Sequence, residues 1–416
     1  MNVLHINSHD LLGSVFNGYY MLDSSNSDVN YEMLVWYRSS NNPKVHTLAP
    51  SSHFFRRLLE ICHGLMLRIG IEGIFGYVTY QILKRKACFK KADIVHLHII
   101  HNVPNFGILQ LPKICKSKKI VWTIHDYWAC SGGCICPMGC KGINEKCVRY
   151  CPHPRRIDSL LGNRAPYYLF RLKQNLYKRV NAHLVFSNTW FSTKAHASVL
   201  LKNHECSIIP FGLNPSLFKK YDSMEIRKKY SVPESSFVIA FRNLPIETDK
   251  FKGIKYTKEA LIRLSSSGEG KNITILMIQN GHGFEELENE FNIIKLGVID
   301  RKKLVEVYSM ANVFLMPSLY ETFGMMALEA MACETPTIVA KGTPLEEIVG
   351  HEECGLVVER ENGQAIADAI LRLKNNPQLA MQLGKNGRKK VLEQYTLEKC
   401  IQMHKELYSS LLNKTN

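Results

Sequence analysis

Short apolar runs alternate with helical patterns along most of the chain. In the first half, the candidate strands are residues 3–7, 94–99, 119–124 and 182–187. The pattern restarts after residue 212, and there the candidate strands are residues 237–241, 273–278, 313–316 and 337–340. Continuous apolar runs separated by helices are typical of a parallel sheet covered by helices on both faces. The pattern therefore predicts an α/β protein with two Rossmann-like domains that face a cleft.

The turn-forming residues around Pro210 and Gly212 predict a linker between these domains. We expect an N-terminal domain at residues 1–210, a C-terminal domain at residues 211–390 and a final helical stretch at residues 391–416. The length of 416 residues suits two domains.

The composition is that of a globular protein with a strong basic excess. Hydrophobic residues make up 45% of the chain and charged residues 22%, which excludes a disordered or fibrous protein. The net charge of +16 favours an anionic partner: nucleic acid, a membrane surface or a phosphate-bearing substrate. Because we find neither a signal peptide nor a bilayer-spanning apolar run, we expect a cytoplasmic protein with reduced thiols.

The segment from Phe54 to Lys91 concentrates this basic charge among large apolar residues. It holds eight Lys or Arg side chains against two Glu. A basic amphipathic helical region can lie on an anionic membrane surface, which would make the protein peripheral on the inner face of the cell membrane. The same pattern also fits a packed helix with a solvated basic face, and both interpretations stay open.

Two carboxylates eight residues apart follow the candidate strand at residues 313–316. Glu321 lies in the expected loop, where it can face a sugar, and Glu329 lies about one turn into the next helix, where it can accept two hydrogen bonds from a ribose diol. Ligands of parallel α/β sheets bind outside the carboxyl ends of the strands. Gly324 allows close approach of the backbone to a ligand, and the free N–H groups of a helix start suit a phosphate.

This run resembles the E-x7-E signature of retaining glycosyltransferases of family 4, the group 1 glycosyltransferases with the GT-B fold. The flanks at residues 297–318 and 329–336 resemble the family as well, although Glu334 stands where the family has Gly. The resemblance implies that Glu321 contacts the donor sugar and that Glu329 binds the ribose of a nucleotide sugar. It also assigns donor-binding positions to Ile299, Phe323 and Gly324, the last two through backbone amides.

A pair of basic residues follows the first strand of the second half. Arg242 and the dipeptide Lys252-Gly253 stand where the family carries an Arg and a Lys-Gly pair that hold the donor diphosphate. Two fixed cations stabilise the charge that grows on a leaving diphosphate, so no catalytic metal is expected. The spacing is longer than the commonest one in the family, which makes Lys250 a competing candidate.

The N-terminal half contributes two further candidates. Gly13 lies in a loop after the first strand, where the family has a Gly-containing loop near the acceptor and the donor phosphate. His125 ends the strand at residues 119–124 and resembles a family His that contacts the donor sugar. Asp126 would orient His125 or contact the acceptor.

Six cysteines fall between residues 130 and 151, and such a cluster in a reducing compartment indicates metal before disulfides. Cys134, Cys140, Cys147 and Cys151 match in order a Cys-rich motif of some family-4 polysaccharide transferases. Four thiolates can enclose a structural Zn²⁺ ion, which would leave no open position for catalysis. Cys130 and Cys136 make the ligand set ambiguous, and free thiols are the alternative.

The resemblance implies a retaining enzyme that moves a sugar from a nucleotide-diphosphate donor to a lipid-linked glycan acceptor in capsule, exopolysaccharide or O-antigen synthesis. In this fold the stretch at residues 391–416 would return to the N-terminal domain. Two alternatives stay open: a GT-B epimerase of nucleotide sugars, and a zinc-containing nucleic-acid-binding protein. The second leaves Glu321 and Glu329 unexplained, so nucleic acid is not an expected partner.

Overall fold

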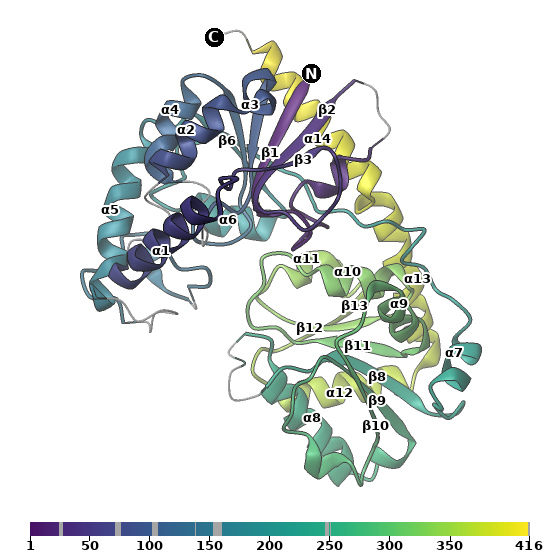
Figure 1. The fold of residues 1–416 in the computed structure, drawn as a ribbon. Coiled ribbons are helices and arrows are strands. Elements are labelled where there is room, and N and C mark those ends of the chain that lie inside the picture. Colours follow the sequence, from purple (N-terminus) through teal and green to yellow (C-terminus); the bar gives the residue numbers. More distant parts are fainter. Residues whose placement is uncertain are drawn as a thin grey trace. The chain divides into compact units, whose positions relative to one another are not determined.

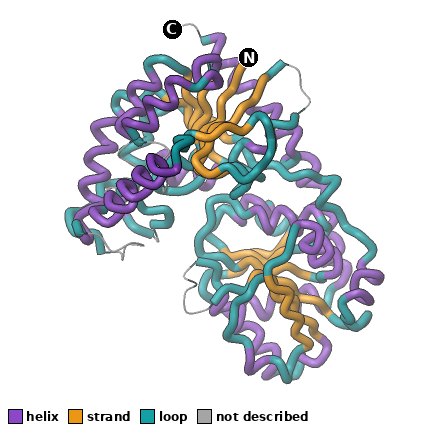
Figure 2. Tube along the Cα trace, in the orientation of Figure 1, coloured by secondary structure: helices purple, strands orange, loops and turns teal. Residues whose placement is uncertain are grey.

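The chain folds into two compact α/β units (Figure 1). A computed structural model describes residues 1–24, 28–70, 76–101, 107–137, 139–152, 160–245, 249 and 251–414. Unit 1 comprises Met1–Gly212 with Glu398–Asn416, and unit 2 comprises Leu213–Leu397. In each unit the strands form an inner sheet and the helices lie outside it (Figure 2). The expected α/β class with two Rossmann-like sheets is confirmed.

Unit 1 contains a seven-stranded parallel sheet in the order β3-β2-β1-β4-β5-β6-β7. The strands are β1 Asn2–His9, β2 Asn30–Tyr37, β3 Val45–Thr47, β4 Ile94–Leu97, β5 Lys119–Thr123, β6 Ala182–Phe186 and β7 Cys206–Ile208. The candidate strands of the first half correspond to β1, β4, β5 and β6. Sequence reasoning missed β2, although it is mostly apolar, and it missed β3 and β7 because they are too short to show a pattern.

The helices of unit 1 cover both faces of its sheet. They are α1 His53–Ile69, α2 Tyr77–Arg85, α3 Ala87–Lys91, α4 Leu111–Cys115, α5 Ala165–Tyr177, α6 Thr189–His196 and α14 Leu397–Asn413, with 3-10 turns at Tyr19–Met21, Ile108–Gln110, Lys141–Ile143 and Gly162–Arg164. Cys400 and Tyr408 of α14 are buried in one core cluster with Val3 and Val121 of the sheet. The last helix of the chain therefore completes the core of the first unit.

Unit 2 contains a six-stranded parallel sheet in the order β10-β9-β8-β11-β12-β13. The strands are β8 Phe237–Arg242, β9 Ile273–Ile278, β10 Asn292–Gly297, β11 Val313–Met316, β12 Thr337–Ala340 and β13 Gly355–Val358. The helices are α7 Ser223–Lys229, α8 Ile254–Ser266, α9 Arg301–Met310, α10 Met325–Ala332, α11 Leu345–Val349, α12 Gly363–Lys374 and α13 Pro377–Gln394, with 3-10 turns at Gly270–Asn272 and Glu285–Leu287. One core cluster joins Ile239 of β8 to Leu261 of α8 and Ile370 of α12.

The C-terminal return lies later in the chain than the sequence placed it. Residues 391–394 still belong to α13 and to unit 2, and the chain enters unit 1 at Glu398. No helix among the described residues is both long and apolar enough to span a membrane.

Each sheet has one point where the strand order reverses. In unit 1 this point lies between β1 and β4, and in unit 2 it lies between β8 and β11. Loops that leave two such neighbouring strands diverge to opposite faces of the sheet, and ligands of open parallel sheets bind there, beyond the carboxyl ends of the strands. The topology thus predicts ligand-binding residues after β8 and β11 in unit 2, and after β1 and β4 in unit 1.

Candidate active site

The loops after β8 and β11 are joined by close backbone contacts. Gly253 has a φ of +73°, and a Cβ atom there would lie 2.2 Å from the carbonyl oxygen of Pro317. The backbone N–H groups of Leu319 and Tyr320 donate to the carbonyl oxygen of Phe251, at 2.7 and 3.1 Å. A side chain at position 253 would separate the two loops, which explains a Gly directly after the candidate Lys.

Lys252 and Glu321, one from each loop, form an ion pair. The Nζ atom lies 2.5 Å from Oε1, and the side chains are 28% and 14% exposed. Asp249 holds the turn in front of Lys252, because its carboxylate accepts from the backbone N–H groups of Lys252 at 2.7 Å and Ile254 at 3.0 Å. Sequence reasoning missed Asp249, although an Asp shortly before a helix start is a known capping signal. The competing candidate Lys250 lies outside the described residues.

Arg242 is the last residue of β8 and lies half-buried at the edge of the sheet. Its Nε atom donates to Oε1 of Gln279 at 2.7 Å, which is the one hydrogen bond of this guanidinium within the described residues. The backbone N–H of Gln279 in turn donates to the carbonyl oxygen of Gly297 at 2.6 Å. This bond connects Arg242 with the loop that contains Ile299, which is half-buried between β10 and α9.

Glu329 is a buried carboxylate on α10, with 8% of its surface exposed. The hydroxyl of Tyr308 on α9 donates to its Oε2 atom at 3.3 Å. Burial raises the pKa of Glu329 to about 7, while the hydrogen bond from Tyr308 and the charge of Arg301 act in the opposite direction. The carboxyl group therefore changes protonation near neutral pH. A ligand that donates hydrogen bonds to it would stabilise its charged form.

The start of α10 requires a glycine. Gly324 has a φ of +121°, and a Cβ atom there would lie 2.2 Å from Cδ2 of Leu345. Phe323, directly before it, is buried. At the other end of α10, Glu334 adopts a left-handed φ of +59° at the position where the family has Gly.

The candidate residues of unit 2 form two groups. Lys252 contacts Glu321, whereas Tyr308 hydrogen-bonds to Glu329 and is influenced electrostatically by Arg242. Gly13 and His125 belong to unit 1 and have their own surroundings.

In unit 1, Gly13 is connected to His125 through an aromatic ring. Gly13 has a φ of +74°, and a Cβ atom there would lie 2.6 Å from Cζ of Phe16. The ring of Phe16 lies 5.3 Å from the ring of His125, and Phe211 stacks on His125 at 5.5 Å with an interplanar angle of 14°. The glycine loop therefore packs against the His side chain by way of Phe16.

His125 contacts another histidine and not its neighbour Asp126. Its Nε2 atom lies 3.1 Å from Nδ1 of His98, whereas Asp126 pairs with His101 at 3.2 Å and accepts from the backbone N–H of Trp128 at 2.8 Å. Of the two roles expected for Asp126, orientation of His125 by a direct hydrogen bond is not seen in the structure.

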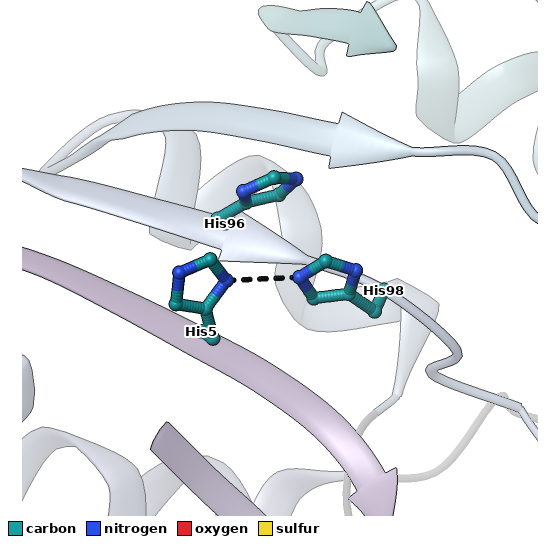
Figure 3. Close-up of side chains that lie close together, drawn as sticks. All are labelled: His5, His96 and His98. Carbon is teal, nitrogen blue, oxygen red and sulfur yellow. Dashed lines mark hydrogen bonds between the residues drawn. The ribbon is translucent and has the colours of Figure 1, made fainter. Parts of the chain in front are cut away.

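The histidine contacts continue into the core of the sheet (Figure 3). His5 of β1 and His98, which follows β4, share a hydrogen bond of 2.9 Å, and His96 stacks on His98. Sequence reasoning missed this cluster. The available signal was three polar His side chains within two apolar candidate strands, residues 3–7 and 94–99.

Several thiols of the cysteine cluster lie near one another. All thirteen cysteines lie within the described residues and are free thiols. Burial, together with proximity to Cys151, Cys147 and Cys140, raises the pKa of Cys134 to about 11. Cys130 is buried, and its Sγ atom donates to the carbonyl oxygen of Tyr127. Burial raises the pKa of Cys130, and the nearby Cys134 acts in the same direction.

A zinc ion would suit the four coupled thiols because it binds them as thiolates and removes their mutual repulsion. Their sulfur atoms are nevertheless not gathered to ligand spacing. Among the described residues, the group of three metal-ligating side chains whose ligand atoms lie within 4.8 Å of one another is His5, His96 and His98.

Solved structures with this architecture identify the fold class. The chain superposes on sucrose-phosphate synthase from Thermosynechococcus elongatus with a TM-score of 0.65 and 18% sequence identity, covering all of both chains. It superposes on HepE from Anabaena, solved in complex with UDP, with a TM-score of 0.66 and 14% identity, covering 99% of this chain and 100% of that one. The two parallel sheets thus define a protein of the GT-B fold.

Sequence comparison identifies a family domain in the second half of the chain. Residues 225–390 match the family described as glycosyl transferases group 1. N-acetyl-alpha-D-glucosaminyl L-malate synthase of Bacillus anthracis is 24% identical over 82% of this chain and 81% of its own length. The capsular polysaccharide biosynthesis glycosyltransferase CapM of Staphylococcus aureus is 24% identical over 66% of this chain and 73% of its own length. The chain carries a glycosyl transferases group 1 domain and is a glycosyltransferase, as its motifs led us to expect.

Proposed function

We propose that the protein transfers a sugar from a nucleotide-diphosphate donor to an acceptor hydroxyl with retention of the anomeric configuration. The observation that carries this proposal is the Lys252–Glu321 pair at the reversal point between β8 and β11. A cation can bind the diphosphate of such a donor, and a neighbouring carboxylate can accept a hydrogen bond from its sugar. The group 1 domain supplies the family context, and the nucleic-acid alternative leaves Glu321 and Glu329 without a role.

In this proposal, different residues of unit 2 bind different parts of the donor. Glu329 accepts hydrogen bonds from the ribose hydroxyls, and Glu321 accepts from a sugar hydroxyl. Arg242 and Lys252 neutralise the diphosphate, and the backbone amides of Phe323 and Gly324 add further donors. Because two fixed cations take up the charge that grows on the leaving group, we assign no catalytic metal.

The transfer step then needs no protein nucleophile. The bond between the sugar C1 and the diphosphate oxygen breaks, and a bond from C1 to the acceptor oxygen forms on the same face. The acceptor proton passes to the oxygen of the departing diphosphate. His125 contacts the donor sugar in this scheme, so that unit 1 contributes to sugar recognition.

We further propose a lipid-linked glycan as acceptor and a capsular, exopolysaccharide or O-antigen product. The name of the CapM relative supports this assignment for a similar chain. The acceptor also separates the proposal from nucleotide-sugar epimerisation, which would convert the donor without any acceptor.

A binding screen followed by a transfer assay tests this function. Thermal shifts against a panel of nucleotides and nucleotide sugars should identify a diphosphate nucleotide as the stabilising ligand. Incubation of that donor with lipid-linked glycans should then release the nucleotide diphosphate, and NMR of the product should show the anomeric configuration of the donor. Donor conversion without acceptor would favour the epimerase, and an inverted product would contradict retention.

We also propose that unit 1 binds an anionic membrane surface through α1. The helix has no buried residue. Phe54, Leu58, Ile61 and Leu65 recur at helical spacing and are 70%, 44%, 50% and 51% exposed. A stripe of large apolar side chains is costly to expose to water, so it marks a surface that another phase or partner covers.

Basic residues accompany this stripe and favour anionic lipid as the occupant. Exposed cationic side chains lie on α1, α2 and α3: Arg57, Arg68, Lys84, Arg85, Lys90 and Lys91. Anionic lipid attracts each such charge by ~1 kcal/mol near the surface, and apolar side chains then enter the interface. A lipid-linked acceptor would share this surface with the enzyme.

Sedimentation with vesicles tests the membrane proposal. The protein should sediment with vesicles that contain phosphatidylglycerol, much less with pure phosphatidylcholine, and less at high salt. One variant replaces five cations with Gln: Lys84, Arg85, Lys86, Lys90 and Lys91. The matched control replaces five exposed lysines of unit 2: Lys255, Lys295, Lys302, Lys341 and Lys389.

The first variant should lose most vesicle binding and keep its turnover of a short soluble acceptor, whereas the control should bind normally. Phe54→Ser with Leu58→Ser should also release the protein. Equal losses in the two Gln variants would show non-specific charge attraction and contradict a surface built around α1.

A further inference from the structure

Three histidines of unit 1 form a continuous hydrogen-bonded chain: His5 in β1, His98 directly after β4 and His125 after β5. Nδ1 of His5 lies 2.9 Å from Nε2 of His98, the bond that Figure 3 shows. Nδ1 of His98 lies 3.1 Å from Nε2 of His125. Parallel pairing of β1 with β4, and of β4 with β5, brings these segments together. The chain runs from the buried reversal point of the sheet to the strand end at which His125 lies.

The surroundings hold these rings tightly in place. A Cβ atom at Gly18 would lie 2.3 Å from Nδ1 of His5, so the glycine makes room for this ring. His96 stacks on His98 with a centroid distance of 4.3 Å. The two nitrogens of His96 hydrogen-bond to the hydroxyls of Tyr408 at 2.6 Å and Thr123 at 2.7 Å. The C-terminal helix α14, which carries Tyr408, therefore helps to fix the chain.

This arrangement fits hydrogen bonding better than metal binding. Zn–N bonds of 2.0–2.1 Å would separate two ligand nitrogens of a tetrahedral site by roughly 3.3 Å. The His5–His98 distance of 2.9 Å is that of an N–H···N hydrogen bond. Both nitrogens of His96 have hydroxyl partners, and its ring is stacked on His98 instead of directing a nitrogen toward a common point.

The three rings are neutral at physiological pH. Burial lowers the pKa of His5 to about 3 and that of His125 to about 4, and burial with the neighbouring histidines lowers the pKa of His98 well below its usual value. A neutral imidazole carries one N–H and one bare nitrogen, so each bond in the chain fixes the tautomer of the next ring. The whole chain can then adopt only two directions.

The two directions differ in which terminal ring nitrogen of the chain carries an N–H without a partner. Nε2 of His5 is buried and has no partner among the described residues, and the same holds for Nδ1 of His125. Each direction leaves one buried N–H without an acceptor in the described structure, either on Nε2 of His5 or on Nδ1 of His125. His5 is fully buried, whereas His125 is partly exposed after β5, where a ligand can supply the acceptor that an orphaned N–H needs. The favoured direction therefore runs from His5 to His98 to His125 and leaves the proton of His125 on Nδ1.

We propose that His98, with His5 behind it, is a positioning residue that fixes His125 as the Nδ1–H tautomer, so that its side chain offers a hydrogen-bond donor to an oxygen of the sugar. This inference rests on the proposed contact of His125 with the donor. The two histidines act only through His125 and touch no reacting atom.

Two substitutions at one position test the proposal. An Asn side chain at position 98 places its amide nitrogen near the site of Nδ1, which faces His125. A Gln side chain places it near the site of Nε2, which faces His5. NMR of full-length protein labelled with ¹⁵N-histidine reads the tautomer of each ring directly, and His125→Gln assigns the signals of His125.

The wild type should show the proton of His125 on Nδ1. His98→Asn should preserve this tautomer and keep kcat/KM for the donor within about twofold. His98→Gln should shift the tautomer and lower kcat/KM by about tenfold, the scale of one hydrogen bond. Thermal unfolding of both variants controls for stability.

A proton on Nε2 of His125 in the wild type would overturn the proposal, as would a metal ion bound to His5 in the purified protein. Equal kinetic losses in both variants with an unchanged tautomer would reduce His98 to a structural role. The NMR result does not depend on turnover, so a failed transfer assay with the expected tautomer would count against the proposed function and not against the histidine chain.

Discussion

The reversal points of the two sheets hold different chemistry. In unit 2 the site contains charged groups, with Lys252 paired to Glu321 and the carboxyl of Glu329 buried under Tyr308. In unit 1 the corresponding position contains histidines that hydrogen-bond to one another and to the hydroxyls of Tyr408 and Thr123, and a buried carboxylate, Asp10, directly follows β1. The two units therefore offer different groups to a ligand: an ion pair and a buried carboxyl in unit 2, and a set of hydrogen-bonded histidines in unit 1.

The sharpest test of the charged half is Lys252→Ala. Charge on the diphosphate grows in the transition state, so the variant should lose about 10²–10³ in kcat and much less in donor affinity. Steady-state kinetics with a soluble acceptor measure both. Lys255→Ala, which removes an exposed lysine of the next helix, should leave the rate unchanged. If Lys250→Ala causes the loss and Lys252→Ala does not, the diphosphate lysine is misassigned by two residues.

Buried charge should make unit 2 sensitive to pH through Glu329. Its pKa of about 7 in the folded state exceeds the ordinary value of 4.5, so the folded state binds more protons between these values. Stability therefore falls as pH rises through this window, by about 3 kcal/mol in total. Chemical unfolding from pH 4.5 to 8 should show this loss in the wild type relative to Glu329→Gln. Glu359→Gln, at an exposed site, should follow the wild type, and parallel curves for all three proteins would contradict a raised pKa.

Zinc content tests the thiol set of unit 1, which sequence and structure describe differently. If Cys134, Cys140, Cys147 and Cys151 bind zinc, purified protein should contain about one ion per chain. Free zinc at about 100 times its Kd would stabilise the folded state by ~2.7 kcal/mol, which a chelator should remove. Cys134→Ser should lose the ion, whereas Cys206→Ser in β7 should keep it. Zinc-free wild type of normal stability would leave four free thiols.

Removal of the Glu329 carboxylate, the proposed ribose ligand, should mainly weaken nucleotide binding. Glu329→Ala deprives a ribose diol of a charged acceptor, which costs ~1.5–3 kcal/mol in affinity for the diphosphate nucleotide. Calorimetric titration measures the loss. An unchanged affinity would remove Glu329 from the ribose and leave it a buried partner of Tyr308.

The smallest expected effect concerns the left-handed residue after α10. Glu334 holds a φ of +59° that costs a non-glycine residue about 1 kcal/mol. Glu334→Gly should therefore raise the free energy of unfolding by about that amount without changing turnover. A destabilised variant would show that the Glu334 side chain contributes more than its backbone strain costs.

The sequence alone predicted more of the candidate site of unit 2 than of the histidine chain of unit 1. Glu321, Glu329 and the Lys252-Gly253 dipeptide lie in strand–loop–helix segments, where local chain geometry determines the spacing between functional groups. Their spacing along the chain was therefore sufficient to name them as candidates. Asp249 was missed although it belongs to the same kind of segment, because an Asp in a loop has many uses.

Sequence by itself determined the α/β class, most of the long buried strands and the group 1 domain, because these depend on local periodicity and on closely spaced motifs. Only the tertiary structure decided that Lys252 pairs with Glu321, that Asp126 pairs with His101, and that His5 reaches His125 through His98. The physical reason is the topology of parallel sheets. His5 and His98 are 93 residues apart in the sequence. Only the pairing of neighbouring strands brings Nδ1 of His5 to 2.9 Å from Nε2 of His98.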